Sequence, residues 1–202
     1  MAQWNAFSPP LQLSAEQVRS LWPRLHCGDT EPCPEDAALL YAWTLFHRGE
    51  FEAAVSQGLS LTAQGLHSAW TVVNRATTVY ANYVEPLESQ RLALLHQAAE
   101  QAQAHVELQP HNANAWYLLA LSLGRYAQGI SVAKALAQGI GARVRDALEK
   151  TIALNPAHSD AKFALATFHA EVIDKVGELI ANMTYGAKKD RGLALYAEAH
   201  AQ

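Results

Sequence analysis

Nine histidines are the side chains in this sequence best suited to proton transfer or metal binding near neutral pH. Such chemistry usually shows as residues at defined spacing, and the strings HExxH, GxSxG, GxGxxG, GK[ST] and CxxC do not occur. An enzyme would have to assemble its site from separate elements. We therefore expect a protein that is not an enzyme and needs no cofactor.

The best local candidate for a metal site is formed by His26, Cys27 and Cys33, with His47 farther along the chain. Zinc needs four ligands in a tetrahedral array, and paired cysteines at zinc sites are usually separated by roughly two to four residues. Cys27 and Cys33 lie farther apart than this. We predict no metal site, and we interpret Cys27 to Pro34, with its glycine and prolines, as a linker.

A second candidate is the pair His96 and Glu100, with His105 placed on the same side of a predicted helix. A histidine and a carboxylate can act in acid–base catalysis where burial tunes them. At this spacing they more often form a weak contact on a solvated helix face, and that is the interpretation we favour.

Arg75 and Arg125 are the strongest candidates for ligand binding, because two guanidinium groups across a groove can clamp a carboxylate. Their positions depend on a repeat of 46 residues. Ala69-Trp70 recurs as Ala115-Trp116, and Leu108-Gln109-Pro110 recurs as Leu154-Asn155-Pro156. A fixed period of this size indicates an array of helical repeats.

Helical periodicity begins at Glu35, where apolar residues recur at intervals of three and four. The turn Arg48-Gly49-Glu50 and the return of the period at Phe51 predict two antiparallel helices. This first unit resembles the tetratricopeptide repeat (TPR) family, whose order of small and large packing residues is matched by Tyr41, Ala42, Leu45, Gly49, Phe51 and Ala54.

The same register predicts three further units. Their core positions are Trp70, Val73, Asn74 and Thr77; Trp116, Leu119, Ala120 and Leu123; and Lys162, Leu165, Ala166 and His169. Pro110 and Pro156 each follow their opening tryptophan by 40 residues, which makes the second and third units 12 residues longer than a standard repeat. We place the extra residues around Tyr83 to Leu87 and from Tyr126 to Gly141, with Gly177 and Gly186 in comparable places in the fourth unit.

Enlarged units in this register resemble the regulator-of-microtubule-dynamics proteins and the bacterial T component of TRAP transporters. The residues that carry the resemblance are Trp70, Arg75-Ala76 and Tyr80-Ala81, the segment from Trp116 to Pro156, and Ala161 to Ala166 with Tyr185-Gly186 and Gly192-Leu193. The resemblance covers residues 36–200. The T components are exported lipoproteins, whereas this sequence starts without a signal peptide or lipobox, so we do not expect their membrane placement.

In the TPR family the first helix of each unit lines a concave groove. The resemblance implies that the groove positions here are Thr71, Asn74, Arg75, Thr78 and Val79; Asn114, Tyr117, Leu121 and Arg125; and Phe163, Thr167 and Glu171. Arg75 and Arg125 either hold a ligand or pair with acidic residues inside the stack and fix its register. Asn74 occupies a core position, where its amide needs hydrogen-bond partners.

The leader, residues 1–34, has a capping-box pattern at Ser14 and Gln17 that predicts the start of a helix. A short leader cannot bury large aromatic side chains by itself. We therefore expect it to close the open end of the stack or its groove with Trp4, Phe7 and Trp22.

Two further predictions concern packing. Trp70 and Trp116 open their helices at positions that we expect to be core. The C-terminal end of a repeat array needs a cap. Leu193, Leu195 and Tyr196 either face a second copy of the protein or belong to a helix that is already polar enough on its outer side, and both alternatives stay open.

Composition excludes several classes of partner. The net charge is −4 and no dense Lys/Arg cluster occurs, so we expect no nucleic-acid binding. No apolar stretch is long enough for membrane insertion. The two cysteines cannot build the disulfide framework of a small secreted domain, so we expect a cytoplasmic protein.

The sequence thus predicts an all-α, right-handed superhelix of about four TPR-like helical hairpins, with an N-terminal capping helix. Residues 1–34 form the leader and residues 35–202 the repeat domain. The expected function is that of an adaptor, which binds a protein or peptide partner in its groove. A protein that binds a small acidic ligand is the alternative, and an enzyme with a groove-borne His/Arg site is a third.

Overall fold

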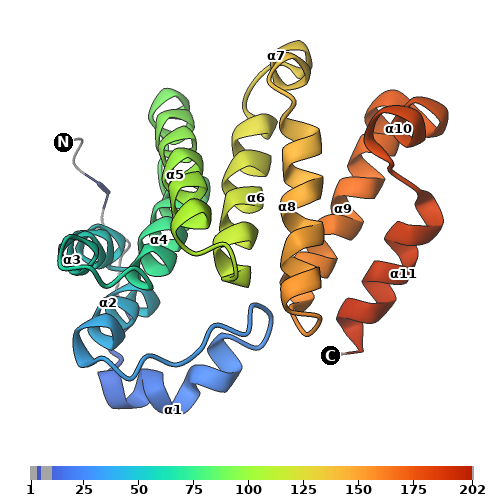
Figure 1. Ribbon diagram of the computed structural model, residues 1–202. Coiled ribbons are helices and arrows are strands. Elements are labelled where there is room, and N and C mark those ends of the chain that lie inside the picture. Colours follow the sequence, from blue (N-terminus) through green and yellow to red (C-terminus); the bar gives the residue numbers. More distant parts are fainter. Residues whose placement is uncertain (1–3, 6–10, 202) are drawn as a thin grey trace.

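Figure 1 shows the computed structural model, which describes residues 4–5 and 11–201. In these residues the chain forms eleven helices and no strand, which confirms the prediction of an all-α fold. The helices are α1 (Ala15–Leu25), α2 (Ala37–Arg48), α3 (Phe51–Ala63), α4 (Ala69–Tyr83), α5 (Glu88–Leu108), α6 (Ala113–Gln128), α7 (Val132–Ala137), α8 (Ile140–Leu154), α9 (Ser159–Val176), α10 (Glu178–Tyr185) and α11 (Lys189–His200).

Helices that follow each other along the chain pack against each other. We group them along the chain into four pairs: α2 with α3, α4 with α5, α6 with α8, and α9 with α11. Neighbouring pairs are joined through α3 and α4 and through α5 and α6 as extensively as the helices within a pair, and less extensively through α8 and α9. The paired helices therefore stand in a row that follows the sequence, with α1 below its N-terminal end (Figure 1).

Local chemistry explains where the first pair begins and turns. The Asp36 side chain accepts a hydrogen bond from the Leu39 amide and so caps α2. At the other end Gly49 has φ 81°, a left-handed conformation that glycine adopts without strain. Its amide bonds back into α2, and α3 starts at Phe51, as the turn at Arg48-Gly49-Glu50 predicted.

The segments in which we placed extra residues take different forms. In the second pair α4 ends at Tyr83, Pro86 lies in the connection, and α5 extends over 21 residues. In the third pair the segment contains the separate short helix α7, which ends at Ala137, and Gly139, with φ 61°, precedes α8. The fourth pair has α10 in the comparable place (Figure 1).

Two clusters of buried side chains make up most of the core. The larger runs from α4 to α11 and includes Tyr80, Leu118 and Leu195. The smaller one packs α1 against α2 and α4 around Trp43. The core positions predicted for the fourth unit are all buried, whereas Trp70 and Trp116, which we expected in the core, are only half-buried.

The tryptophans differ in burial because of where each helix begins. Trp70 and Trp116 lie in the first turn of α4 and α6, close to the loops that precede these helices. There the indole Nε1–H of Trp116 donates to the carbonyl of Pro110, 2.9 Å away, and the ring stays at the surface. Trp43, in the middle of α2, is completely buried instead.

The leader packs on the first two helix pairs, as expected. Ser14 and Gln17 form the predicted capping box at the start of α1, and Trp22 is buried with its ring 5.5 Å from that of Trp43. Trp4 stacks on Tyr80 of α4 at 4.1 Å. Phe7, the third aromatic residue of this prediction, lies outside the described residues.

The C-terminal helix α11 packs largely against other parts of its own chain. Leu195 is fully buried, and the ring of Tyr196 lies 5.1 Å from that of Phe163 on α9. The Tyr196 hydroxyl also lies 3.0 Å from that of Thr167. Of the three residues that we considered for contact with a second copy, Leu193 is the one that stays largely exposed.

Candidate functional site

The segment between α1 and α2, which we interpreted as a linker, is packed against α4, α6 and α9. Its loop passes below the end of α6 and beside the lower end of α8 (Figure 1). There the Asp160 amide, in the first turn of α9, donates to the Gly28 carbonyl over 3.0 Å. A Cβ atom on Gly28 would stand 2.1 Å from the Asp160 carboxylate, so the approach is as close as glycine allows. We refer to His26–Glu31 as the leader segment.

The centre of this contact is the Asp29 carboxylate, which is 1% exposed. It forms an ion pair and hydrogen bond with the guanidinium of Arg75 on α4. The Arg75 Nη2 atom also lies 3.8 Å from a carboxylate oxygen of Asp160. Arg75 is therefore engaged by two acidic residues of its own chain, one on each side.

On the other side of Asp29 lies a pair of histidines. The Nδ1 atom of His26 is 3.0 and 3.1 Å from the two carboxylate oxygens of Asp29, and its Nε2 atom is 3.1 Å from Nε2 of His47. Burial, with the positive charge of Arg75, lowers the pKa of His26 to about 3. Burial likewise lowers the pKa of His47 to about 4. Both rings are neutral at pH 7, so His26 donates to Asp29 and accepts from His47.

Asn114 on α6 holds the next part of the leader segment. Its amide nitrogen donates to the Asp29 carbonyl over 3.2 Å and to the Glu31 carboxyl over 2.6 Å. Its amide oxygen accepts from Nε2 of His158, whose Nδ1 in turn accepts from the Ala161 amide and caps α9. Burial raises the pKa of Glu31 to about 8, and the bond from Asn114 opposes this shift.

Thr30, at the middle of the contact, has an unusual backbone. Its φ is 50°, in the left-handed region that β-branched residues rarely enter. Such a conformation costs about 1–3 kcal/mol and persists where surrounding contacts hold it. Here the Thr30 hydroxyl accepts a hydrogen bond from the side-chain amide of Asn155, which follows α8.

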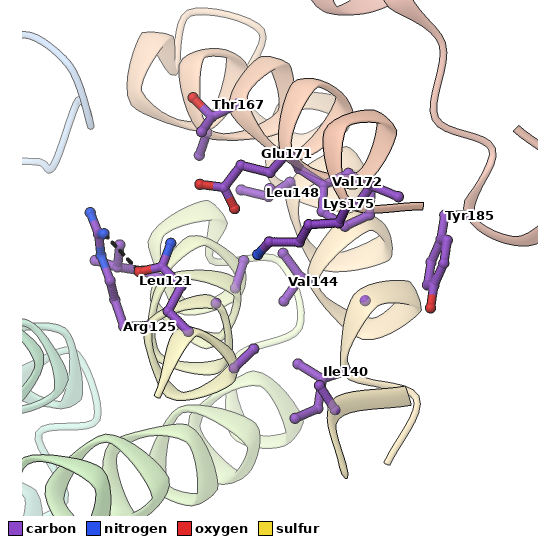
Figure 2. Close-up of a pocket in the computed structure, with 18 of the residues that line it drawn as sticks. Leu121, Arg125, Ile140, Val144, Leu148, Thr167, Glu171, Val172, Lys175 and Tyr185 are labelled. Atoms are coloured by element: carbon purple, nitrogen blue, oxygen red, sulfur yellow. Dashed lines mark hydrogen bonds between the residues drawn. The ribbon is translucent and has the colours of Figure 1, made fainter. Parts of the chain in front are cut away.

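A separate pocket lies farther along the row of helices. It has a volume of about 430 Å³ and is lined by side chains of α6 to α9, together with Tyr185 at the end of α10. Figure 2 shows its apolar wall, to which Leu121, Ile140, Val144, Leu148 and Val172 contribute. Charged and polar side chains from α6 and α9 stand at its edge: Arg125, Thr167, Glu171 and Lys175.

The predicted groove residues fall into three groups, apart from Val79, which is half-buried on α4 and belongs to none of them. Arg75 and Asn114 hold the leader segment. The pocket is lined by Tyr117, Leu121, Arg125, Phe163, Thr167 and Glu171. Three others are buried in the helix packing, namely Thr71, Asn74 and Thr78.

The three buried side chains, Thr71, Asn74 and Thr78, form only some of the hydrogen bonds that their polar atoms could make. The Thr78 hydroxyl lies 2.9 Å from that of Ser122. The Asn74 amide and the Thr71 hydroxyl have no hydrogen-bond partner among the described residues, so the partners expected for Asn74 are not found there. Arg75 is paired with acidic residues, and Arg125 instead donates to Gln128 over 3.1 Å.

The histidine candidates that the sequence suggested outside the groove do not form sites. His96 and Glu100 are 3.7 Å apart and exposed, as in an ordinary surface pair. His105 is completely buried, so placing it on the same side was wrong: nine residues are about two and a half turns of helix, which put it on the opposite face. In the part of the chain that the structure describes, no group of three or more His, Cys, Asp or Glu residues is arranged to hold a metal ion.

Sequence reasoning missed the acidic residues of the leader segment and the histidine that holds Asn114. Gly28-Asp29 lay within the segment that we interpreted as a linker, and nothing in the linear pattern connects it to Arg75. His158 gave a weak signal, since it stands at the position of a helix N-cap. Neither a scan of protein-family models nor a search of curated proteins finds a match to this chain. None of the helices in the described residues combines the length and apolar character that a membrane span needs.

Proposed function

We propose that this protein is a non-catalytic, TPR-like adaptor of the cytoplasm that binds an apolar segment of a partner protein or peptide in the pocket between α6 and α9. The observation that carries the proposal is the pocket itself. Its volume of about 430 Å³ is in the range of ligand sites, and its wall is mostly aliphatic and aromatic. Two apolar side chains of a bound segment would fill a space of this size.

The edge of the pocket supports a peptide as the ligand. The ring of Phe163, which contacts Tyr196, is 58% exposed beside it and so offers accessible apolar area. Arg125, Glu171 and Lys175 provide charges of both signs around the apolar wall (Figure 2). An apolar anchor with a polar rim is the usual design of a peptide site.

A non-catalytic role agrees with the state of the buried histidines. His26, His47 and His158 have lowered pKa values and are engaged in hydrogen bonds that hold the leader segment or cap α9. None of the three lines the pocket. Their perturbed pKa values therefore follow from burial in a structural network.

Photo-crosslinking tests the proposal. The photoreactive residue p-benzoylphenylalanine replaces Phe163, and crosslinked products from the source cells are analysed by mass spectrometry. We expect adducts with a protein or peptide. Gly124→Leu should reduce them at least tenfold, because Gly124 lines the pocket and a side chain there would enter open space. Ala104→Leu, on the exposed face of α5, is the matched control.

The adaptor proposal fails if no peptide adduct forms, or if Gly124→Leu leaves the adducts unchanged while the protein stays folded by circular dichroism. Both results remove the pocket as the binding site. Adducts that Ala104→Leu reduces equally would show a general effect of substitution and also contradict the proposal.

A small acidic ligand is the second candidate, and it is favoured by two positive side chains at the pocket. Lys175 has no ion-pair partner among the described residues, and Arg125 bonds only the neutral Gln128 in that part of the chain. Native mass spectrometry of the purified protein distinguishes this candidate. A bound small molecule that is lost in Arg125→Ala and Lys175→Ala would replace the peptide as the ligand.

A further inference from the structure

We propose that the leader segment His26–Glu31 occupies, within its own chain, a binding site for an extended acidic peptide, built from Arg75, Asn114 and Asn155. When the segment leaves, this site would take an acidic segment of a partner protein. The inference goes beyond the proposed function, because none of these three residues lines the apolar pocket, although Asp160 borders both sites.

The contacts are those of a bound peptide. Consecutive residues of the leader segment are recognised through both main chain and side chain. The Gly28 carbonyl accepts from the Asp160 amide, the Asp29 carbonyl accepts from Asn114, and the Thr30 hydroxyl accepts from Asn155. Together with Arg75 of α4, these donors come from the second, third and fourth helix pairs, so one short segment bridges most of the row.

Charge defines the class of peptide. The two acidic side chains of the segment, Asp29 and Glu31, point to a donor set made of the Arg75 guanidinium and the Asn114 amide. A guanidinium that pairs with a carboxylate in a site of low exposure is a strong and specific recognition element. The site therefore suits an ionised aspartate that is followed, with one residue between them, by a glutamate in its neutral form, the pattern Asp-x-Glu.

Two features make the segment displaceable. Thr30 is held at φ 50°, a conformation that the free segment would leave. The carboxyl group of Glu31 is half-buried against a single amide donor in the described residues. Each of these costs is present only while the segment is docked, so docking is weaker than its number of contacts suggests.

The segment is also tied to the leader, which keeps it near the site. Trp22 Nε1 donates to the Glu31 carbonyl over 2.7 Å, and His26 contacts His47 of α2. A tethered segment competes at an effective concentration in about the millimolar range. A peptide added in solution therefore binds with an apparent affinity reduced by the small fraction of molecules whose site is open.

A disulfide that fixes the leader segment in its docked position, which we call the lock, tests this competition directly. In a chain with Cys27→Ser and Cys33→Ser, the substitutions Thr30→Cys and Asn155→Cys place two thiols where the native side chains touch. The probe is a fluorescein-labelled peptide with the sequence of residues 24–36 and serine in place of cysteine. Fluorescence polarisation should show binding to the reduced protein and a loss of at least tenfold on oxidation.

An opened variant gives the converse result. Gly28→Ala adds a Cβ atom that would stand 2.1 Å from the Asp160 carboxylate and so opposes docking of the segment. We therefore expect the labelled peptide to bind this variant at least tenfold more tightly than the wild-type chain. The control peptide has Asn and Gln in place of Asp29 and Glu31, and it should bind the opened variant at least tenfold more weakly.

Two results would overturn the inference. One is equal binding of the peptide to the oxidised and reduced lock. The other is an opened variant that binds neither peptide or both alike. If the lock does not fold, as judged by circular dichroism, the comparison of Gly28→Ala with wild type still decides. Gly124→Leu, which fills the apolar pocket, should leave peptide binding unchanged, so failure here is distinct from failure of the proposed function.

Discussion

The carboxylate of Asp29, in the loop after α1, pairs with the guanidinium of Arg75 on α4, 46 residues later in the sequence. Both groups are largely removed from water. Such a pair need not stabilise a protein relative to apolar residues, but loss of one partner leaves the other buried and unpaired. The arginine best placed to bind a ligand thus already holds an acidic group of its own chain.

Removal of the Arg75 charge should destabilise the protein. We expect Arg75→Met to lower the free energy of unfolding by about 3–5 kcal/mol, because Asp29 would remain buried without its cationic partner. Urea unfolding followed by circular dichroism measures the change. Arg125→Met is the control and should cost less than about 1 kcal/mol, since Arg125 bonds only Gln128.

The Asp29→Asn and Arg75→Met double variant separates the pair from the rest of the site. It should be more stable than Arg75→Met alone, because no charge is left unpaired. A double variant whose loss equals the sum of the two single losses would show that the pair is not coupled.

The buried histidines should make the fold sensitive to acid. His26, His47 and His158 have pKa values of about 3 to 4 when folded and an ordinary value near 6.5 when unfolded. The unfolded chain therefore binds more protons between these values, and stability falls as pH decreases from 6.5 towards 4. Melting temperatures from pH 7.5 to 5 should show this loss.

Substitution of single histidines shows which imidazole ring causes the loss of stability at acidic pH. His47→Gln should flatten the decline below pH 6.5, with a change on the order of 1–2 kcal/mol at pH 5. His96→Gln should leave it unchanged, because the His96 side chain is 52% exposed. An equally steep decline in His47→Gln would contradict the role of His47.

How much the sequence predicts depends on whether a feature is local. The breaks between helices at Gly49, near Pro86 and at Gly139 follow from backbone chemistry that each residue carries by itself, and these were predicted. The repeat register likewise identified most positions that face the core. The docking of Asp29 on Arg75 depends on how four helix pairs are arranged in space, and no spacing in the chain encodes it.

The pocket residues show the same limit of prediction from sequence. Arg125, Phe163 and Thr167 were predicted as groove residues because the register gives the direction of each side chain. Val144 and Lys175 were missed, since the register treats the second helix of a pair as packing and ends the groove earlier on α9. The open space beside Gly124 depends on the absence of a side chain, which periodicity does not detect.

Glu31 should cause the opposite pH dependence at alkaline pH. Its pKa is about 8 in the folded chain, against an ordinary value of 4.5, so the folded state holds the proton more tightly. The stability that this provides is complete below pH 4.5 and is lost as pH rises through 8. Glu31→Gln keeps a neutral side chain at every pH.

We therefore expect Glu31→Gln to be more stable than the wild-type chain at pH 9, by on the order of 1–3 kcal/mol, and close to it at pH 5. Urea unfolding at the two pH values measures the difference. Glu107→Gln, on an exposed position of α5, should show no such dependence. A wild-type-like decline in Glu31→Gln would place the alkaline titration elsewhere.

Two glycines inside helices should respond in opposite ways to the same substitution. In the middle of a helix, alanine is favoured over glycine by roughly 0.5–1 kcal/mol. A Cβ atom on Gly124 of α6 meets nothing within 4 Å, so Gly124→Ala should stabilise the protein by about that amount. On Gly58 of α3 the same atom would stand 2.5 Å from a methyl group of Val73 on α4. Because α3 and α4 pack closely, Gly58→Ala should cost about 1–3 kcal/mol. Urea unfolding of both variants decides, and a gain in stability for Gly58→Ala would show that the contact between α3 and α4 is looser than the structure indicates.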